Sequence, residues 1–120
     1  MAETLLYQGV GVNPANGLRV RLGHNIETLA APATLTPQSA QLQALDPGGT
    51  GETVVLPAEE SSQGLFFFIK NTGSGGGGDD LTVEDDTTVA VTIASLANNE
   101  CTLVVCDGAS WTSLGVITFA

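Results

Sequence analysis

Five carboxylates gather in a short stretch of the chain and have the most evident capacity for chemistry. They are Asp79, Asp80, Glu84, Asp85 and Asp86. Clustered carboxylate oxygens are the ligands that hard cations such as calcium prefer. Their spacing does not fit the loop of an EF-hand, so the preferred interpretation is a solvated acidic rim at strand ends, with a loosely bound cation as the alternative.

A glycine-rich run and a single histidine are the other features that could suggest a reaction. The run from Gly73 to Gly78 precedes two aspartates, whereas a phosphate-binding loop needs a lysine and a hydroxyl residue leading into a helix. His24, the only histidine, lies in a Gly-His-Asn stretch that predicts a turn, without a nucleophile motif nearby. The sequence therefore predicts a mobile loop tip at the glycines, and a protein that is not an enzyme and uses no cofactor or metal.

The two cysteines, Cys101 and Cys106, lie in one predicted strand. Their odd separation places them on opposite faces, and an extended strand holds them roughly 16 Å apart, too far for a disulfide. We expect two small buried hydrophobic side chains in a reducing compartment.

The charge balance excludes two classes of partner. Thirteen acidic residues face three basic ones, Arg19, Arg21 and Lys70, and the net charge is -10. Such a chain is not expected to bind nucleic acid or an anionic membrane. The sequence shows neither an apolar run of about 20 residues nor a signal peptide, so synthesis in the cytoplasm is expected.

The second half of the chain predicts a series of strands. Its apolar runs are short, contain many β-branched or aromatic residues, and are bounded by Gly, Asn, Asp or Ser. The runs are Leu65 to Lys70, Leu81 to Asp85, Val89 to Ile93, Cys101 to Cys106, and Trp111 to Thr118.

The first third of the chain is less regular. Leu18 to Leu22 alternates, with Arg19 and Arg21 on one face and apolar residues on the other. Ile26 to Pro37 contains two prolines and many small residues, which favours an extended segment. We therefore expect an N-terminal arm or edge strands over residues 1–37, followed by a β domain over residues 38–120.

The spacing of the predicted strands indicates the fold class. About eight or nine short strands, roughly 8 to 12 residues apart, predict a single all-β domain, an antiparallel sandwich or barrel of jelly-roll type. No internal repeat is apparent at the 20 to 50 residue periods that are typical of solenoids.

Three successive phenylalanines on one predicted strand bear on possible partners. Phe67 points to one face of the sheet, and Phe66 and Phe68 point to the other, so both faces need cover. One face can form the interior, and the other can pack against the same chain or a second subunit. The candidate contacts with a partner protein or a second subunit are Leu18, Arg19, Val20, Arg21, Phe66 and Phe68.

The order of several β-framework segments resembles the small β-rich virion proteins of tailed bacteriophages, among them head decoration (cement) proteins and β domains of tail fibres. The resemblance covers about Thr36 to Gly115. It rests on the order of Leu45–Gly49, Val54–Ala58, Phe67–Gly73, Leu81–Val83, Thr92–Leu96, Val104–Gly108 and Trp111.

The resemblance implies a homotrimeric structural protein on the outside of a phage head. Such proteins bind the major capsid protein and stabilise the shell, and they are assembled in the host cytoplasm. A tail-fibre or receptor-binding module is the alternative. A small hydrolase, the third possibility, is disfavoured because no catalytic set is present.

Overall fold

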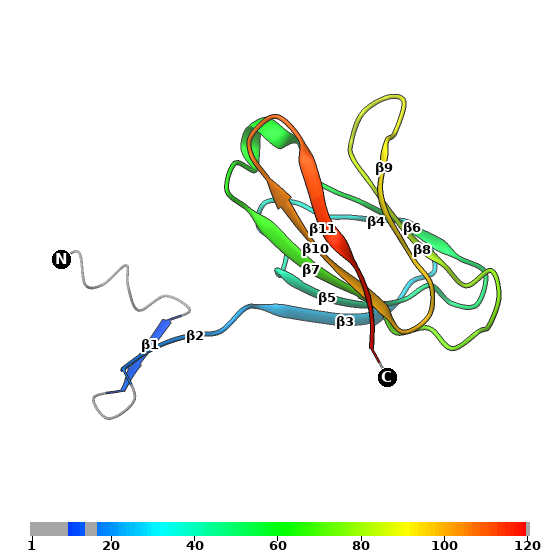
Figure 1. Ribbon diagram of the computed structural model, residues 1–120, viewed down its shortest axis with the longest axis horizontal. Coiled ribbons are helices and arrows are strands. Elements are labelled where there is room, and N and C mark those ends of the chain that lie inside the picture. Colours follow the sequence, from blue (N-terminus) through cyan, green and yellow to red (C-terminus); the bar gives the residue numbers. More distant parts are fainter. Residues whose placement is uncertain (1–9, 14–16, 120) are drawn as a thin grey trace.

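The computed structural model describes residues 10–13 and 17–119, and of residues 10–20 it describes only the backbone (Figure 1). Two sheets pack as a sandwich, and a separate hairpin of β1 (Val10–Asn13) and β2 (Gly17–Val20) precedes them. The larger sheet has the order β11 (Trp111–Thr118), β10 (Glu100–Cys106), β7 (Phe66–Asn71), β5 (Leu42–Asp46) and β3 (His24–Thr28). The smaller sheet has the order β4 (Ala33–Thr34), β6 (Glu52–Val55), β8 (Leu81–Glu84) and β9 (Thr92–Leu96).

From β3 to β8, successive strands alternate between the two sheets, so this part of the chain winds as a coil. β3, β5 and β7 pair in parallel in the larger sheet, and β4, β6 and β8 do so in the smaller one. β9, β10 and β11 pair antiparallel with their neighbours. The prediction of a mostly β sandwich is confirmed, but the antiparallel, jelly-roll-like topology is wrong because the six coil strands pair in parallel.

The coil turns differ in length, which hides them from a search for repeats. In the larger sheet Leu42 pairs with His24 before it and with Phe68 after it, and the second of these partners is further away along the chain. The turns of the smaller sheet lengthen in the same direction, from the pairing of β4 with β6 to the pairing of β6 with β8. A coil whose turns grow in this way leaves no fixed sequence period.

The sandwich does not close into a barrel. Among the described strands, β11 and β3 form the edges of the larger sheet, and β4 and β9 form those of the smaller one. The barrel alternative is therefore wrong. β3 and β4 both lie within residues 1–37, where an arm or edge strands were predicted, and the adjoining Leu29 and Leu35 belong to the core. Figure 1 shows the β1–β2 hairpin standing away from the sandwich.

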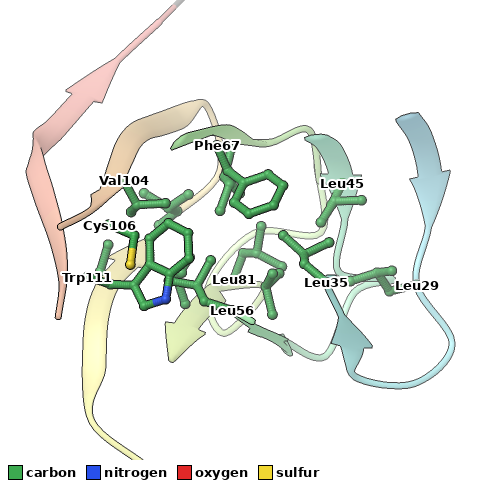
Figure 2. Close-up of a cluster of buried hydrophobic side chains, with 14 residues drawn as sticks. Leu29, Leu35, Leu45, Leu56, Phe67, Leu81, Val104, Cys106 and Trp111 are labelled. Atoms are coloured by element: carbon green, nitrogen blue, oxygen red, sulfur yellow. The ribbon is translucent and has the colours of Figure 1, made fainter. Parts of the chain in front are cut away.

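The core lies between the sheets, and β7, β8, β9 and β10 each contribute alternate residues to it (Figure 2). Phe67 is fully buried and its ring centroid lies 5.8 Å from that of Trp111, within the range of favourable aromatic pairs. Trp111 Nε1 donates a hydrogen bond to the Pro57 carbonyl, 2.9 Å away, so its buried N–H is satisfied. Cys106 belongs to this core.

The predicted burial of the two cysteines and their placement on opposite faces are confirmed. Cys101 and Cys106 are both buried free thiols of β10. Cys101 pairs with Lys70 and Cys106 is an odd number of residues further on, so the two side chains lie on opposite faces of the larger sheet.

Two polar side chains fix turns at the ends of the strands, Asn71 after β7 and Asp107 after β10. The Asn71 amide nitrogen donates hydrogen bonds to the carbonyls of Asp79 (3.0 Å) and Leu96 (2.8 Å), and thereby joins two loops. The Asp107 carboxylate accepts from the backbone N–H groups of Ala109 and Ser110, both at 2.8 Å, and closes the turn before β11. These N–H donors lower the pKa of Asp107.

Candidate interaction surfaces

The outer face of the larger sheet is predominantly apolar. Side chains of directly paired residues share a face, so the register assigns one row to His24, Leu42, Phe68 and Leu103, and a second to Ile26, Ala44, Lys70, Cys101 and Ile117. A third row contains Phe66, Val105 and Thr112. We call the apolar face the side chains of Ile26, Leu42, Phe66, Phe68, Leu103, Val105, Leu114 and Ile117.

A bulge in β11 adds Leu114 to this face. The register shifts between Thr102 and Val104, so Leu114 and Gly115 together lie opposite Leu103. Gly115 has φ +116°, a backbone conformation that side-chain-bearing residues rarely adopt. Ser113 faces inward and its hydroxyl lies 2.7 Å from that of Thr102, so Leu114 points outward.

The apolar face is accessible at its margins and half-buried at its centre. Ile26, Leu114 and Ile117 expose 71%, 67% and 65% of their surface. Phe66 and Phe68, predicted as subunit contacts, are half-buried on this face, whereas Phe67 points into the core. A contiguous group of large apolar side chains on a surface is typical of a binding interface.

The electrostatics of this face differ from those of the whole chain. In its three rows, all within the described residues, Lys70 is the only lysine or arginine, and none of the side chains is a carboxylate. The Lys70 ammonium lies 4.5 Å from the centre of the Phe119 ring, a cation–π contact. These three rows of a chain with net charge -10 therefore carry no carboxylate, and the next row along β3 and β5 pairs Thr28 with Asp46.

The hairpin residues predicted as contacts have a less complete description. Leu18, Arg19 and Val20 lie in β2, where Val20 pairs with Val10, and their side chains are outside the described part. β2 ends at Val20, so Arg21 follows the strand instead of continuing the predicted alternation, and it is exposed.

The five acidic residues do not come together as a site. Asp79 is buried, and its two carboxylate oxygens accept from the N–H groups of Gly49 (2.8 Å) and Gly75 (3.0 Å). Asp85 accepts from Val91 N and Thr87 Oγ1 at 2.9 and 2.7 Å, and the backbone donor of Val91 above all lowers its pKa. Within residues 10–13 and 17–119, no group of three or more His, Cys, Asp or Glu side chains could hold a metal ion.

The glycine-rich run, predicted to be a mobile tip, is tied to the body through Asp79. A Cβ atom on Gly73 would clash with Asp79 Oδ2, and one on Gly75 would lie 2.9 Å from both that oxygen and Gly49 Cα. At these two positions glycine is required because the loop backbone packs directly on the carboxylate. His24, predicted in a turn, is the first residue of β3.

Sequence reasoning missed two kinds of residue. Ile26, Leu114 and Ile117 were not assigned to an interface, because their place beside Phe68 depends on strand order. Glu59 was not assigned to the acidic cluster. The parallel pairing of β6 with β8 places the segments that follow them side by side, and burial followed by the carboxyl of Asp86 raises the pKa of Glu59.

Comparison of the chain with protein-family models, curated proteins and solved structures gives no match. Among the described residues, no helix is both long and apolar enough to span a membrane.

Proposed function

We propose that this chain is a structural virion protein, a capsid decoration or cement protein of a tailed bacteriophage that self-associates and binds the outer surface of the head. The observation that supports this most is the apolar face without carboxylates on a strongly acidic chain. Such a face favours association with a second protein surface, and the acidic remainder keeps the assembly soluble.

The occupant that we assign to the apolar face is a second copy of this chain, in a homotrimer. Between two copies, each with net charge -10, close approach is favourable only where carboxylates are absent from both surfaces. The three rows of the apolar face meet this condition, with Asp46 in the adjoining row at their margin, and Phe66 and Phe68 supply aromatic side chains of the kind that dominate interface energetics.

The β1–β2 hairpin is the segment that we assign to the major capsid protein. It stands away from the sandwich, and Arg19 and Arg21 are two of the three basic residues of the chain (Figure 1). They would pair with carboxylates of the shell, together with contacts of Leu18 and Val20. Reversing both charges, Arg19→Glu with Arg21→Glu, should weaken binding to purified heads about tenfold, since exposed pairs contribute up to about 1 kcal/mol each. Unchanged binding would exclude the hairpin.

The same proposal places the chain on the capsid exterior and gives it no catalytic role, no cofactor, and no nucleic-acid or membrane partner. The charge of -10 and the use of Asp79 and Asp85 as loop acceptors support this part of the proposal.

The test is the copy number of the chain in purified virions, measured by quantitative mass spectrometry against the major shell protein. A number comparable with that of the shell protein is expected for a decoration protein. A small fraction of it would assign the chain to the tail fibre or a receptor-binding module instead, and absence from the particle would overturn both.

A further inference from the structure

Among the described strands, none pairs with the outer edge of β3. Leu42 N donates to the Gly23 carbonyl at 3.0 Å, and Leu29 N donates to the Asp46 carbonyl at 2.8 Å. The odd-numbered residues from Gly23 to Leu29 therefore point their backbone groups toward β5. Successive residues of a strand point these groups to opposite sides, so the outer edge presents the N–H and C=O groups of His24, Ile26 and Thr28.

The other three edges of the sandwich each carry a feature that opposes pairing with another chain. β11 has a bulge at Leu114 and Gly115, and β4 has only two residues and directly follows Pro32. β9 lies against β11. Bulges, prolines, very short strands and covered edges are the means by which natural proteins prevent edge pairing. β3 instead pairs regularly with β5, contains no proline or lysine, and has Ile26, 71% exposed, at its centre. It is therefore the edge that can best accept a further strand.

The β3 sequence His-Asn-Ile-Glu-Thr is complementary to itself in the antiparallel direction. When Ile26 lies opposite Ile26 of a second copy, all five residues of β3 have a partner, and the residues whose backbone faces the edge form the hydrogen-bonded pairs. Asn25 then lies opposite Glu27 of the second copy, so each carboxylate meets an amide. A register with Glu27 opposite Glu27 would instead place two like charges directly opposite each other.

We propose that two copies of this chain pair antiparallel through their β3 edges, about a twofold axis at Ile26. The Ile26 side chains of the two copies then lie side by side, and the row of the apolar face that contains Ile26 and Ile117 continues into the second copy. A groove of about 750 Å³ between β3 and β4, lined in part by Asn25 and Glu27, leaves room for the inward side chains of the added strand. Asn25 Nδ2, which donates to Glu27 Oε1 of its own chain at 2.8 Å, lies opposite the Glu27 carboxylate of the second copy.

This pairing goes beyond the proposed function and does not depend on it. The proposed trimer is held by apolar side chains on the outer face of the larger sheet, whereas the pairing is held by backbone hydrogen bonds at its edge. A twofold contact between copies that belong to different trimers would link one trimer to the next. A chain that forms no trimer would still pair, as a dimer.

Hydrogen exchange of single amides in the full-length protein, followed by NMR at several protein concentrations, tests the pairing. The Ile26 N–H should be protected at high concentration, and its protection should fall on dilution. The Asn25 and Glu27 N–H groups point toward β5 and should stay protected throughout. A freely exchanging Ile26 N–H at high concentration would overturn the proposal. Protection that does not change on dilution, and so comes from the same chain, would also overturn it.

Two variants of Thr28 test the backbone hydrogen bonds. In the proposed register the Thr28 N–H donates to the His24 carbonyl of the second copy, and the twofold axis repeats this bond at the other end of the pair. Thr28→Pro removes the donor without removing a bond to β5, whereas Thr28→Ala, the matched control, keeps it. At the same high concentration Thr28→Pro should speed exchange of the Ile26 amide at least about tenfold, and Thr28→Ala should not. Equal effects of the two variants would overturn the proposal.

Phe68→Asp separates the edge from the apolar face. This variant should break the contact of the proposed trimer and leaves the backbone of β3 unchanged, so the Ile26 N–H should keep its concentration-dependent protection. Protection that is lost in Phe68→Asp but kept in Thr28→Pro would come from the apolar face and would overturn the pairing. Failure of the proposed function would, by contrast, leave the result for Ile26 as it is.

Discussion

The two sheets of the sandwich carry different outer faces. On the smaller sheet, the register aligns Thr53 with Thr82 and Ser95, and Val55 with Glu84 and Thr92. That face is mostly polar, as expected for the solvated side of a half-buried sheet. The larger sheet has phenylalanine, leucine and isoleucine at the equivalent outward positions.

The difference is that the larger sheet has large apolar side chains on both of its faces. Its inner face uses the side chains of the core, such as Phe67 and Ile69, and its outer face repeats the same residue types. A sheet with two apolar faces needs a second layer on each. The smaller sheet supplies one layer, and in our proposal further copies of the chain supply the other.

The largest expected effect compares adjacent phenylalanines on the two faces of β7. Phe67→Ala should lower the free energy of unfolding by about 3 to 5 kcal/mol, because it leaves a cavity beside Trp111. Phe68→Ala should cost the dissociated chain about 1 kcal/mol or less, since its side chain is only half-buried. Urea unfolding at low protein concentration measures both. Equal losses would mean that Phe68 is a core residue and the face is not an interface.

Introducing a carboxylate on the outer face of each sheet shows which of the two faces is the self-association surface. Phe68→Asp should weaken self-association by about a hundredfold or more, because an unpaired buried charge costs about 3 kcal/mol or more. Thr82→Asp, on the polar face of the smaller sheet, is the matched control and should leave association unchanged. Sedimentation equilibrium measures both variants. Equal weakening by the two would assign self-association to some other surface.

How well these faces could be predicted from the sequence depends on how far apart along the chain the contacting residues lie. Most strands from Phe66 to Thr118 follow from local alternation, and so does the opposite orientation of Phe67 and Phe68. The strand predicted at Val89 to Ile93 is displaced: β9 covers Thr92–Leu96, and Val89 and Val91 are exposed before it. The position of Ile26 beside Phe68's row depends on parallel pairing between turns of unequal length, which no local pattern encodes. For the same reason Glu59 could not be assigned to the end of β8.

The buried Asp79 is a further case in which composition indicated the wrong environment. A run of acids predicted a solvated rim, yet this carboxylate is 1% exposed and holds two loop N–H groups. Its partners, Gly49 and Gly75, are separated widely enough in the sequence that only the coil brings them together. Glycines in a run indicate a loop, but they do not indicate what the loop packs against.

The loop that packs on Asp79 should depend on this buried carboxylate for its stability. Asp79→Ala should lower the free energy of unfolding by about 2 kcal/mol, because the N–H groups of Gly49 and Gly75 lose their acceptor. Asp80→Ala, at the exposed neighbouring position, should change it by no more than about 0.5 kcal/mol. Thermal unfolding compares the two. Equal effects would show that the loop does not depend on the buried carboxylate.

The smallest expected effect concerns the acids beside the smaller sheet, where two carboxylates should respond to pH with opposite signs. Burial and the Asp86 carboxyl raise the pKa of Glu59, so ionisation of Glu59 opposes folding. The protonated form of Glu59 is therefore compatible with the fold at low pH, and stability is lost as pH rises through its folded pKa. Glu59→Gln should therefore stabilise the protein at pH 7, by less than about 1 kcal/mol because the site is partly solvated, and the gain should vanish below about pH 4.

Asp85 is the matched contrast to Glu59. Its pKa is lowered by the Val91 N–H, so its contribution is present above the unfolded pKa and is lost as pH falls. Asp85→Asn should accordingly destabilise the protein at pH 7, again by less than about 1 kcal/mol. Urea unfolding at pH 7 and at pH 3 measures both variants. If the two variants change the free energy of unfolding at pH 7 with opposite signs, negative charge is already unfavourable beside Glu59, and a second acidic copy would not dock there. A Glu59→Gln variant that is destabilised at pH 7 would remove this distinction between the two sheets.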